Sequence, residues 1–307
     1  MTNESQLRAD IVEVGRRMYA RGYTASNDGN ISVRLGQDRL LMTPKSVCKG
    51  FMTPDMMCIT DLEGRKLQGE RDPSSEMLMH LEVYRQRPDV AAVVHAHPPT
   101  ATGFAVAGIP LDRAVLAEVL TTLGSIPIAE YATPSTHELP EAVRKYIKAH
   151  DGMLLANHGA LTVGADLFGA YYKMEIVEHF AKISLVARML GRENLIAREE
   201  VLRLQDLRGT YGIKAPAPIC ADDTMAPPDD QAACQVVQAP PGGGSRLVPD
   251  PPSLASSTVA SFGAASPLAP ASRATASLGA TGGEDREIRL TYRELSELIE
   301  DAIRSLR

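Results

Sequence analysis

The sequence lacks several features that would point to common classes of protein. It contains no tryptophan, and its four cysteines (Cys48, Cys58, Cys220 and Cys234) show no C-x-x-C spacing of the kind found in structural zinc sites. Reduced thiols in a cytoplasmic protein are the simpler interpretation. No apolar run approaches the roughly 18 residues of a membrane-spanning helix, so we expect no contact with a membrane interior.

The charge balance and the first residues exclude further classes. A formal net charge of −6 gives no reason to expect nucleic acid as a partner, because a phosphate backbone attracts a basic surface. The opening segment MTNESQLRADIVEVG is polar and acidic where a secretory signal would be basic and then apolar. A hydrophobic content of 44% and a charged content of 23% are ordinary for a globular protein. We therefore expect a cytoplasmic protein with a substantial core.

The composition changes sharply near Ala215 and divides the chain into three parts. Residues 215–284 hold about half of the 21 prolines and a single aromatic residue, Phe262. Such a segment cannot bury enough apolar surface to offset its ordering entropy, so we predict a disordered Pro/Ala/Gly-rich linker. Residues 1–214 are then the folded domain, and residues 285–307 form a separate element.

The last segment, LTYRELSELIEDAIRSLR, has the pattern of an amphipathic helix. Thr291 and Glu294 give it the T-x-x-E start of a capping box. The apolar residues of its predicted docking face are Leu295, Leu298, Ile299, Ile303 and Leu306. Its polar face mixes acids with arginines, whereas helices at a membrane surface usually carry a cationic face. Docking onto its own domain or tetramer and docking into a groove of a partner are the remaining alternatives.

Helical and extended patterns alternate within residues 1–214. Helices are predicted at about 7–22, 74–87, 98–107, 113–123, 137–150, 166–190 and 199–209. Strands are predicted at about 31–35, 39–43, 56–60, 90–97 and 126–132, with two more inside 152–164. Helices and short strands mixed in this way indicate an α/β layered fold with a central sheet, but they do not give the strand order.

The segment VVHAHPPT carries the strongest chemical signal. His95 and His97 are two apart on a predicted strand, so their side chains leave the sheet on the same side. His158, in NHGA, follows another apolar run and precedes a glycine, which places it at a second strand end. Three histidines at strand ends with an open fourth position are typical of a catalytic metal site. Packing or helix ends are the simpler interpretation for the other four, His80, His137, His150 and His179.

Polar segments next to predicted strands and helices supply an acid and possible anion ligands. In PSSEMLMH, Ser74, Ser75 and Glu76 open a predicted helix, where backbone N–H groups and the helix dipole attract anions. The alternative is a simple helix start with Ser74 as the N-cap residue. TASNDGNIS and LMTPKSV, the latter with Lys45, present small donors to an anion. Loops of this composition also serve only to turn the chain.

Taken in order, S-N-D-G-N-I-S, T-P-K-S, P-S-S-E, H-A-H-P and N-H-G resemble the class II aldolase/adducin family, most of all its L-fuculose-phosphate aldolases, over nearly all of residues 5–214. The resemblance implies a layered fold with a central, mainly antiparallel sheet flanked by helices, and a homotetramer with active sites between subunits. It also implies one zinc ion per subunit held by His95, His97 and His158, with Glu76 as the general base. Tyr211 would reach the site of a neighbouring subunit. The implied phosphate-binding residues are Asn27, Asn30, Lys45, Ser46, Ser74 and Ser75.

The implied reaction is zinc-dependent cleavage of a ketose 1-phosphate, such as L-fuculose or L-rhamnulose 1-phosphate, to dihydroxyacetone phosphate and lactaldehyde. In the synthesis direction zinc would stabilise the enediolate charge while Glu76 takes the proton, and in cleavage the same groups would act in reverse. One departure concerns a second tyrosine of these aldolases, because Arg113 or Ala114 stands at its position. The group that protonates the aldehyde oxygen and the stereochemical preference are therefore left open.

Three other functions within the resembled family are alternatives. A sugar-phosphate epimerase would have aspartate after the serine pair and a further histidine shortly after H-x-H, where this sequence has Glu76 and Pro-Pro-Thr. A decarboxylase of a phosphorylated sugar acid would use the same metal and base, so it stays open. A non-catalytic, adducin-like interaction module is disfavoured because the histidines and the glutamate are all present.

The terminal helix on its Pro/Ala/Gly-rich tether resembles the encapsulation peptides of bacterial microcompartment enzymes. The resemblance implies shell proteins as partners and the microcompartment lumen as the location. A reactive aldehyde product would be a reason to enclose the enzyme that makes it. The function implied for the domain is therefore consistent with the location implied for the terminal helix.

Overall fold

Strand β5 (Ala92–Ala96), with the sequence AVVHA, is buried along its whole length, as expected for a strand in the middle of a sheet that is covered on both faces. The computed structural model describes residues 4–213, 215 and 217. Most of the predicted linker and all of the predicted terminal helix with its docking face lie outside the described residues, so those predictions remain untested.

The described strands form one eight-stranded sheet in the order β4-β3-β2-β1-β5-β8-β7-β6. Its other strands are β1 (Asn30–Leu35), β2 (Arg39–Met42), β3 (Cys58–Asp61), β4 (Lys66–Gln68), β6 (Ile128–Ala129), β7 (Gly152–Leu155) and β8 (Gly159–Gly164). All neighbours pair antiparallel except β6 and β7, which are parallel. The expected layered α/β fold with a mainly antiparallel sheet is confirmed.

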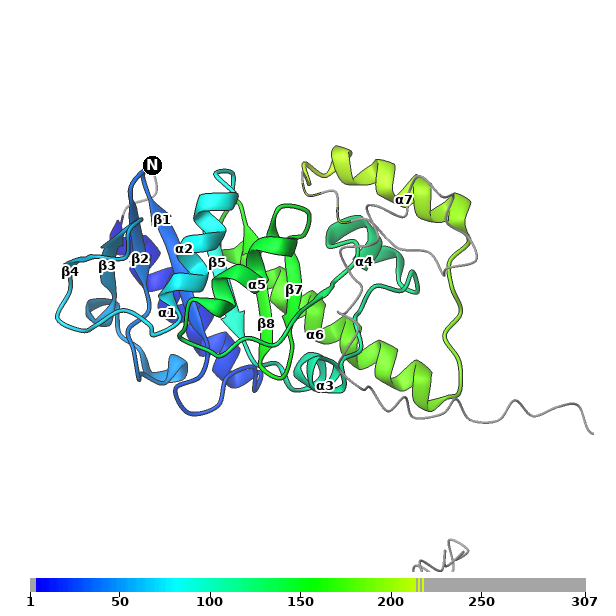
Figure 1. Cartoon of the computed structure of the whole chain (residues 1–307), viewed down its shortest axis with the longest axis horizontal. Helices are drawn as coiled ribbons and strands as arrows, with labels where there is room; N and C mark the ends of the chain where they lie inside the picture. Colours follow the sequence, from blue (N-terminus) through cyan, green and yellow to red (C-terminus); the bar gives the residue numbers. More distant parts are fainter. Residues whose placement is uncertain (1–3, 214, 216, 218–307) are drawn as a thin grey trace, which may run out of the picture. The chain divides into compact units, whose positions relative to one another are not determined.

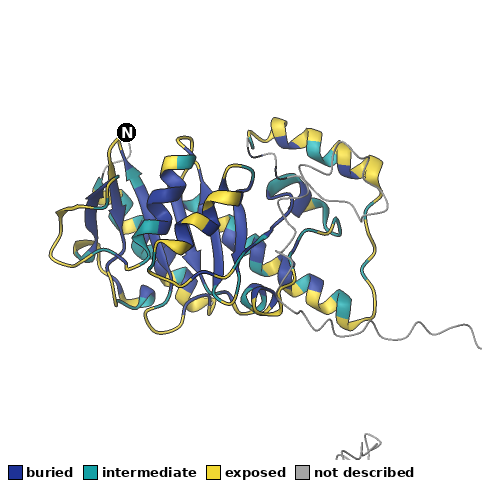
Figure 2. Ribbon diagram, in the orientation of Figure 1, coloured by how far each residue is buried: buried dark blue, intermediate teal, exposed yellow. Residues whose placement is uncertain are grey.

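Helices cover both faces of this sheet and enclose two apolar cores (Figures 1 and 2). The helices are α1 (Glu4–Ala20), α2 (Met77–Gln86), α3 (Pro99–Ala107), α4 (Ala117–Thr122), α5 (Glu138–Ile147), α6 (Leu167–Met189) and α7 (Arg198–Thr210), with short 3-10 turns at Lys49–Phe51 and Pro54–Met56. Helices α1, α3 and α6 share one core with Val94, whereas α2 and α5 share the other with Val93. Successive β5 residues thus face opposite layers, and His95 is on the side of α2 and α5.

Several predicted elements differ from the structure, among them α2, α4, β6 and the missed strand β4. Helix α2 begins at Met77 rather than Ser74, because Ser74–Glu76 form a turn in which the Ser74 carbonyl accepts from the Met77 N–H. Helix α4 and strand β6 are shorter than predicted; apolar residues of the loop between them, such as Leu123 and Ile126, are buried without belonging to either element. Strand β4 was missed because its three residues are exposed and carry no apolar pattern.

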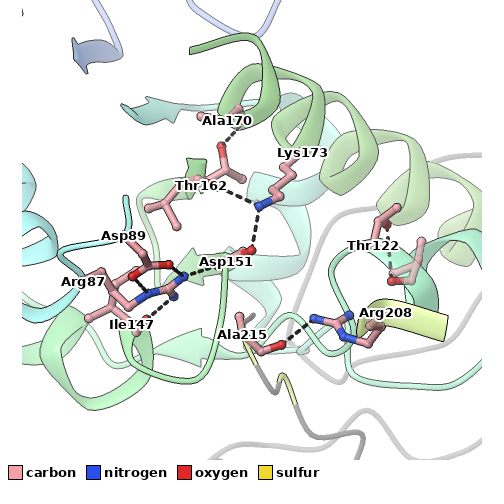
Figure 3. A network of polar contacts seen from close by, with 12 residues as sticks. Arg87, Asp89, Thr122, Ile147, Asp151, Thr162, Ala170, Lys173, Arg208 and Ala215 are labelled. Atoms are coloured by element: carbon pink, nitrogen blue, oxygen red, sulfur yellow. Dashed lines mark hydrogen bonds and ion pairs between the residues drawn. The ribbon is translucent and has the colours of Figure 1, made fainter. Parts of the chain in front are cut away.

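An ion-pair network centred on buried Arg87 and Asp151 braces the end of the β5–β8 pair that is remote from His95 (Figure 3). Arg87 donates to Asp89 and to Asp151, with nitrogen–oxygen distances of 2.8 and 2.9 Å. Lys173 of α6 donates to the other Asp151 oxygen at 2.6 Å and to the Val163 carbonyl at 3.0 Å. Because each buried charge has a partner, the network joins both helical layers to the sheet without an isolated buried charge.

The described contacts of the domain extend just beyond residue 214. Ala215 and Ala217 are both buried. Arg208 of α7 donates to the Ala215 carbonyl at 2.8 Å, and the Ala217 N–H donates to the Ala149 carbonyl at 2.7 Å. Among the described residues, no helix is long and apolar enough to cross a membrane.

Candidate active site at the ends of β5 and β8

Strand pairing brings the three predicted histidine ligands together. In the β5–β8 pair Ala96 lies opposite Ala160, so His97, just after β5, meets the turn that holds His158, just before β8. The ring centroids of His95, His97 and His158 are 4.7–5.0 Å apart. The structure therefore places the three predicted ligands in one cluster.

Gly159 permits this close approach. A Cβ atom at this position would lie 2.5 Å from the Ala96 carbonyl oxygen and 2.5 Å from a carbon of the His97 ring. Both distances are shorter than real Cβ contacts, and one of the contacted atoms belongs to the rigid backbone. Asn157, two residues before Gly159, adopts a left-handed conformation with φ of 55°. Asparagine tolerates this conformation better than most residues do. The N-H-G sequence is thus suited to the tight turn that presents His158.

The cluster fits a divalent metal ion. His95 Nδ1 lies 2.9 Å from the Ala160 carbonyl oxygen, so Nδ1 carries the hydrogen and the Nε2 lone pair is left for the cluster. His97 Nδ1 lies 3.3 Å from Asp28 Oδ2, a carboxylate–histidine pair of the kind that orients metal ligands. The two Nε2 atoms are then 3.1 Å apart. Nitrogens bound to one tetrahedral zinc ion would be separated by about 3.3 Å.

The third histidine completes a possible ligand set. One ligand atom from each histidine lies within 4.8 Å of the others. His158 Nδ1 is buried and has no hydrogen-bond partner among the described residues, which is costly for a polar atom unless something binds it. Burial lowers the pKa of both His95 and His97, and the neutral imidazole is the form that binds metals.

Glu76 lies against this cluster. Its two carboxylate oxygens are 3.1 Å from His158 Nε2 and 3.4 Å from His95 Nε2. The Asn30 side-chain amide donates to Glu76 Oε2 at 2.8 Å. Burial alone would raise the pKa of Glu76, but His95, His158 and the Asn30 hydrogen bond outweigh it and hold the pKa below its ordinary value. Glu76 is therefore a carboxylate at neutral pH, the form that can accept a proton.

A polar cavity of about 290 Å³ opens in front of Glu76, His97 and His158. All six residues predicted to bind phosphate line it, namely Asn27, Asn30, Lys45, Ser46, Ser74 and Ser75. Ser46 and Ser135 in its wall have φ of 59° and 65°, left-handed values that are uncommon outside glycine. Non-glycine residues held in such conformations are frequent at binding sites.

Two predicted site features lie elsewhere. Tyr211 follows α7 as its C-cap residue, is 65% exposed, and is not among the residues that line the cavity. Arg113, which occupies the region of the missing second tyrosine, pairs with Glu193 at 2.8 Å. A role of Tyr211 at the site of a neighbouring subunit stays a prediction.

Sequence reasoning missed three residues that support the site. Lys49 is almost fully buried, lines the cavity, and donates to the Asn27 carbonyl at 3.0 Å and the Val47 carbonyl at 2.6 Å. Asp28 orients His97, and His80 hydrogen-bonds to Asn30. Their positions depend on tertiary contacts, and the only signal in the sequence is their closeness to the motifs.

Comparisons with known proteins match most of the described domain to one protein family. Residues 9–185 match the class II aldolase and adducin N-terminal domain. The chain is 33% identical over 181 residues to the L-fuculose phosphate aldolase of Methanococcus maripaludis, an alignment covering 59% of this chain and 97% of that protein. It is 30% identical over 190 residues to the 3-oxo-tetronate 4-phosphate decarboxylase of Pectobacterium atrosepticum, covering 61% and 87%.

A solved structure gives the same result for the fold. An L-fuculose 1-phosphate aldolase superposes with a TM-score of 0.64 at 30% identity, covering 69% of this chain and 98% of that one. Together with the matched domain and the assembled histidine cluster, this similarity shows that the chain belongs to the class II aldolase/adducin family and is an enzyme of the class II aldolase type.

Proposed function

We propose that the protein is a zinc-dependent aldolase that cleaves a ketose 1-phosphate, of the L-fuculose or L-rhamnulose 1-phosphate type, to dihydroxyacetone phosphate and lactaldehyde. The observation that carries the proposal is the Glu76 carboxylate, held beside His95 and His158 at the wall of a cavity lined by anion-binding groups. Proton transfer next to a carbonyl needs this combination of a base, an electrophile and a binding site for the charged end of the substrate.

Each part of the cavity has a separate task in this proposal. His95, His97 and His158 would hold zinc, which as a Lewis acid stabilises negative charge that develops on the substrate oxygens. Glu76 takes or returns the proton on the reacting carbon. The serines, the asparagines and Lys45 donate to the phosphate group, and buried Lys49 supplies a further positive charge behind them.

A specific observation favours a second candidate, decarboxylation of a phosphorylated 3-oxo sugar acid. An aldolase needs a group that takes the proton from the substrate hydroxyl during cleavage and returns it to the aldehyde oxygen during synthesis, but Arg113 at the relevant position is already paired with Glu193. Decarboxylation forms a similar enediolate and needs no group at the aldehyde. Helix α7 ends at exposed Tyr211, which in the aldolase proposal supplies the missing proton donor from a neighbouring subunit of a homotetramer.

The reaction is tested by assaying the purified protein with L-fuculose 1-phosphate, L-rhamnulose 1-phosphate and 3-oxo-tetronate 4-phosphate. We expect dihydroxyacetone phosphate from one of the two ketose phosphates, and a Glu76→Gln variant that is slower by about 10²–10⁴-fold because it has lost the base. Glu82→Gln is the matched control, since Glu82 is a buried glutamate of α2 that pairs with Arg144 and does not line the cavity. If only the sugar acid reacts, with release of carbon dioxide, the decarboxylase candidate replaces the aldolase. Full turnover by Glu76→Gln would disprove the role of Glu76 as the base.

Metal content gives a second test. Wild-type protein should carry one zinc ion per chain by elemental analysis, and zinc should raise its melting temperature, because a ligand that binds only the folded state stabilises it. His97→Ala and His158→Ala should lose both properties, whereas exposed His137→Ala should keep them. A His158→Ala protein that still binds one zinc ion would remove His158 from the ligand set.

Phosphate affinity should depend on pH through Lys49. Burial lowers the pKa of Lys49 to about 8, although Cys48, Asp28 and Glu76 nearby oppose the shift. The ammonium is charged below this pH and neutral above it, while a phosphate monoester is already doubly ionised there. Calorimetric titration with a phosphate monoester should show weaker binding as the pH rises from 7 to 9.5. Lys49→Met should bind about tenfold more weakly at pH 7 and lack this pH dependence; an unchanged wild-type profile would contradict the role.

For the terminal segment, which lies outside the described residues, we propose capture by shell proteins of a bacterial microcompartment. The support is the amphipathic pattern of residues 285–307 together with the reactive aldehyde product of the proposed reaction. Residues 285–307 fused to a fluorescent protein should form puncta in cells that make shell proteins. Exchanging Leu298 and Ile303 for aspartate should abolish them, because the apolar face would be lost. A diffuse signal from the unaltered fusion would refute the proposal.

A further inference from the structure

A continuous row of buried hydrogen bonds runs from the Glu76 carboxylate into the layer between the sheet and α2. Asn30 Nδ2 donates to Glu76 at 2.8 Å, and Asn30 Oδ1 lies 2.5 Å from His80 Nε2. His80 Nδ1 lies 2.7 Å from Ser32 Oγ, which in turn lies 2.9 Å from the Tyr84 hydroxyl. The four residues behind Glu76 are all buried.

The direction of every hydrogen bond in this row follows from the carboxylate. Ionised Glu76 can only accept, so the Asn30 nitrogen must face it and the Asn30 oxygen must face His80. His80 therefore carries its hydrogen on Nε2. Burial lowers the pKa of His80 to about 4, so the ring is neutral and has one hydrogen to give. Its Nδ1 then accepts from Ser32, and Ser32 accepts from Tyr84.

The elements that supply the row explain why it is rigid. Asn30 and Ser32 are two apart on β1 and point to the α2 side of the sheet, while His80 and Tyr84 are one turn apart on α2. Asn30 also lies directly opposite His95 in the β1–β5 register. The amide that holds Glu76 is thus fixed by a strand on one side and by a helix on the other.

We infer that His80 is a positioning residue for Glu76, acting through Asn30. Its Nε2 hydrogen keeps the oxygen of the Asn30 amide turned inward, so that the amide nitrogen faces the Glu76 carboxylate. Without that hydrogen the amide is free to rotate by half a turn, which would set the Asn30 oxygen against the carboxylate and displace Glu76 from its place beside His95 and His158. The inference rests on the proposed role of Glu76 as the base.

Substitution of His80 tests the role through catalysis. His80→Leu removes both hydrogen bonds, whereas His80→Gln keeps a donor near the position of Nε2. We expect His80→Leu to lower kcat about 10–100-fold, the usual cost of losing a group that orients a functional residue, with KM and zinc content within twofold of wild type. His80→Gln should recover most of the lost kcat. His150→Leu is the control, because His150 is equally buried but bonds to the Ser125 carbonyl.

A spectroscopic measurement keeps the inference testable if His80→Leu does not fold. In ¹⁵N-labelled wild-type protein at pH 7.5, two-bond ¹H–¹⁵N spectra should show His80 as the neutral tautomer with hydrogen on Nε2, assigned by loss of its signals in His80→Gln. An Nδ1–H tautomer or a charged ring would overturn the inference, as would a folded His80→Leu protein with wild-type kcat. Failure of wild-type protein to cleave any of the three substrates would overturn the proposed function instead, and the tautomer would still report on the row.

Discussion

The contact between Gly159 and the end of β5 is the constraint on which the rest of the site depends. Only a residue without a Cβ allows the turn before β8 to approach the Ala96 carbonyl and the His97 ring so closely. That approach brings His158 to the two histidines of β5, and Glu76 is then held by the cluster that results. A shift of one strand against the other would separate His158 from His95 and His97, so the histidine cluster is as precise as the β5–β8 pairing.

Each residue of the candidate site is also held in place by a second group behind or beside it. The Ala160 carbonyl fixes His95, Asp28 fixes His97, and the buried row through Asn30 fixes Glu76. Lys49 does the same for the loop backbone at Asn27 and Val47. The orientation of the site is therefore distributed over β1, β5, β8, α2 and two loops, whose own positions depend on the two apolar cores.

The sequence was enough to predict the layered fold and three histidines at strand ends from its apolar patterns, and the residues that line the cavity from the resemblance of its ordered motifs to a known family. It could not give the strand order or the exposed strand β4, which shows no apolar alternation. It also assigned His80 to ordinary packing and overlooked Lys49. A buried histidine or lysine in a sequence looks the same whether it packs or orients a neighbour, and only the tertiary contacts of Asn30 and Asn27 distinguish the two.

The last described backbone contact of the domain has a mechanical consequence. The Ala217 N–H is tied to the Ala149 carbonyl, just before β7, while Leu155 at the other end of β7 leads into the turn with His158. A pull on the chain beyond Ala217 would be carried first by Ala149 and by Arg208 at Ala215, about 13 Å of strand away from the histidines. Tension on that end of the chain would thus act on α7 and on the connection between α5 and β7 before it could reach the histidine cluster.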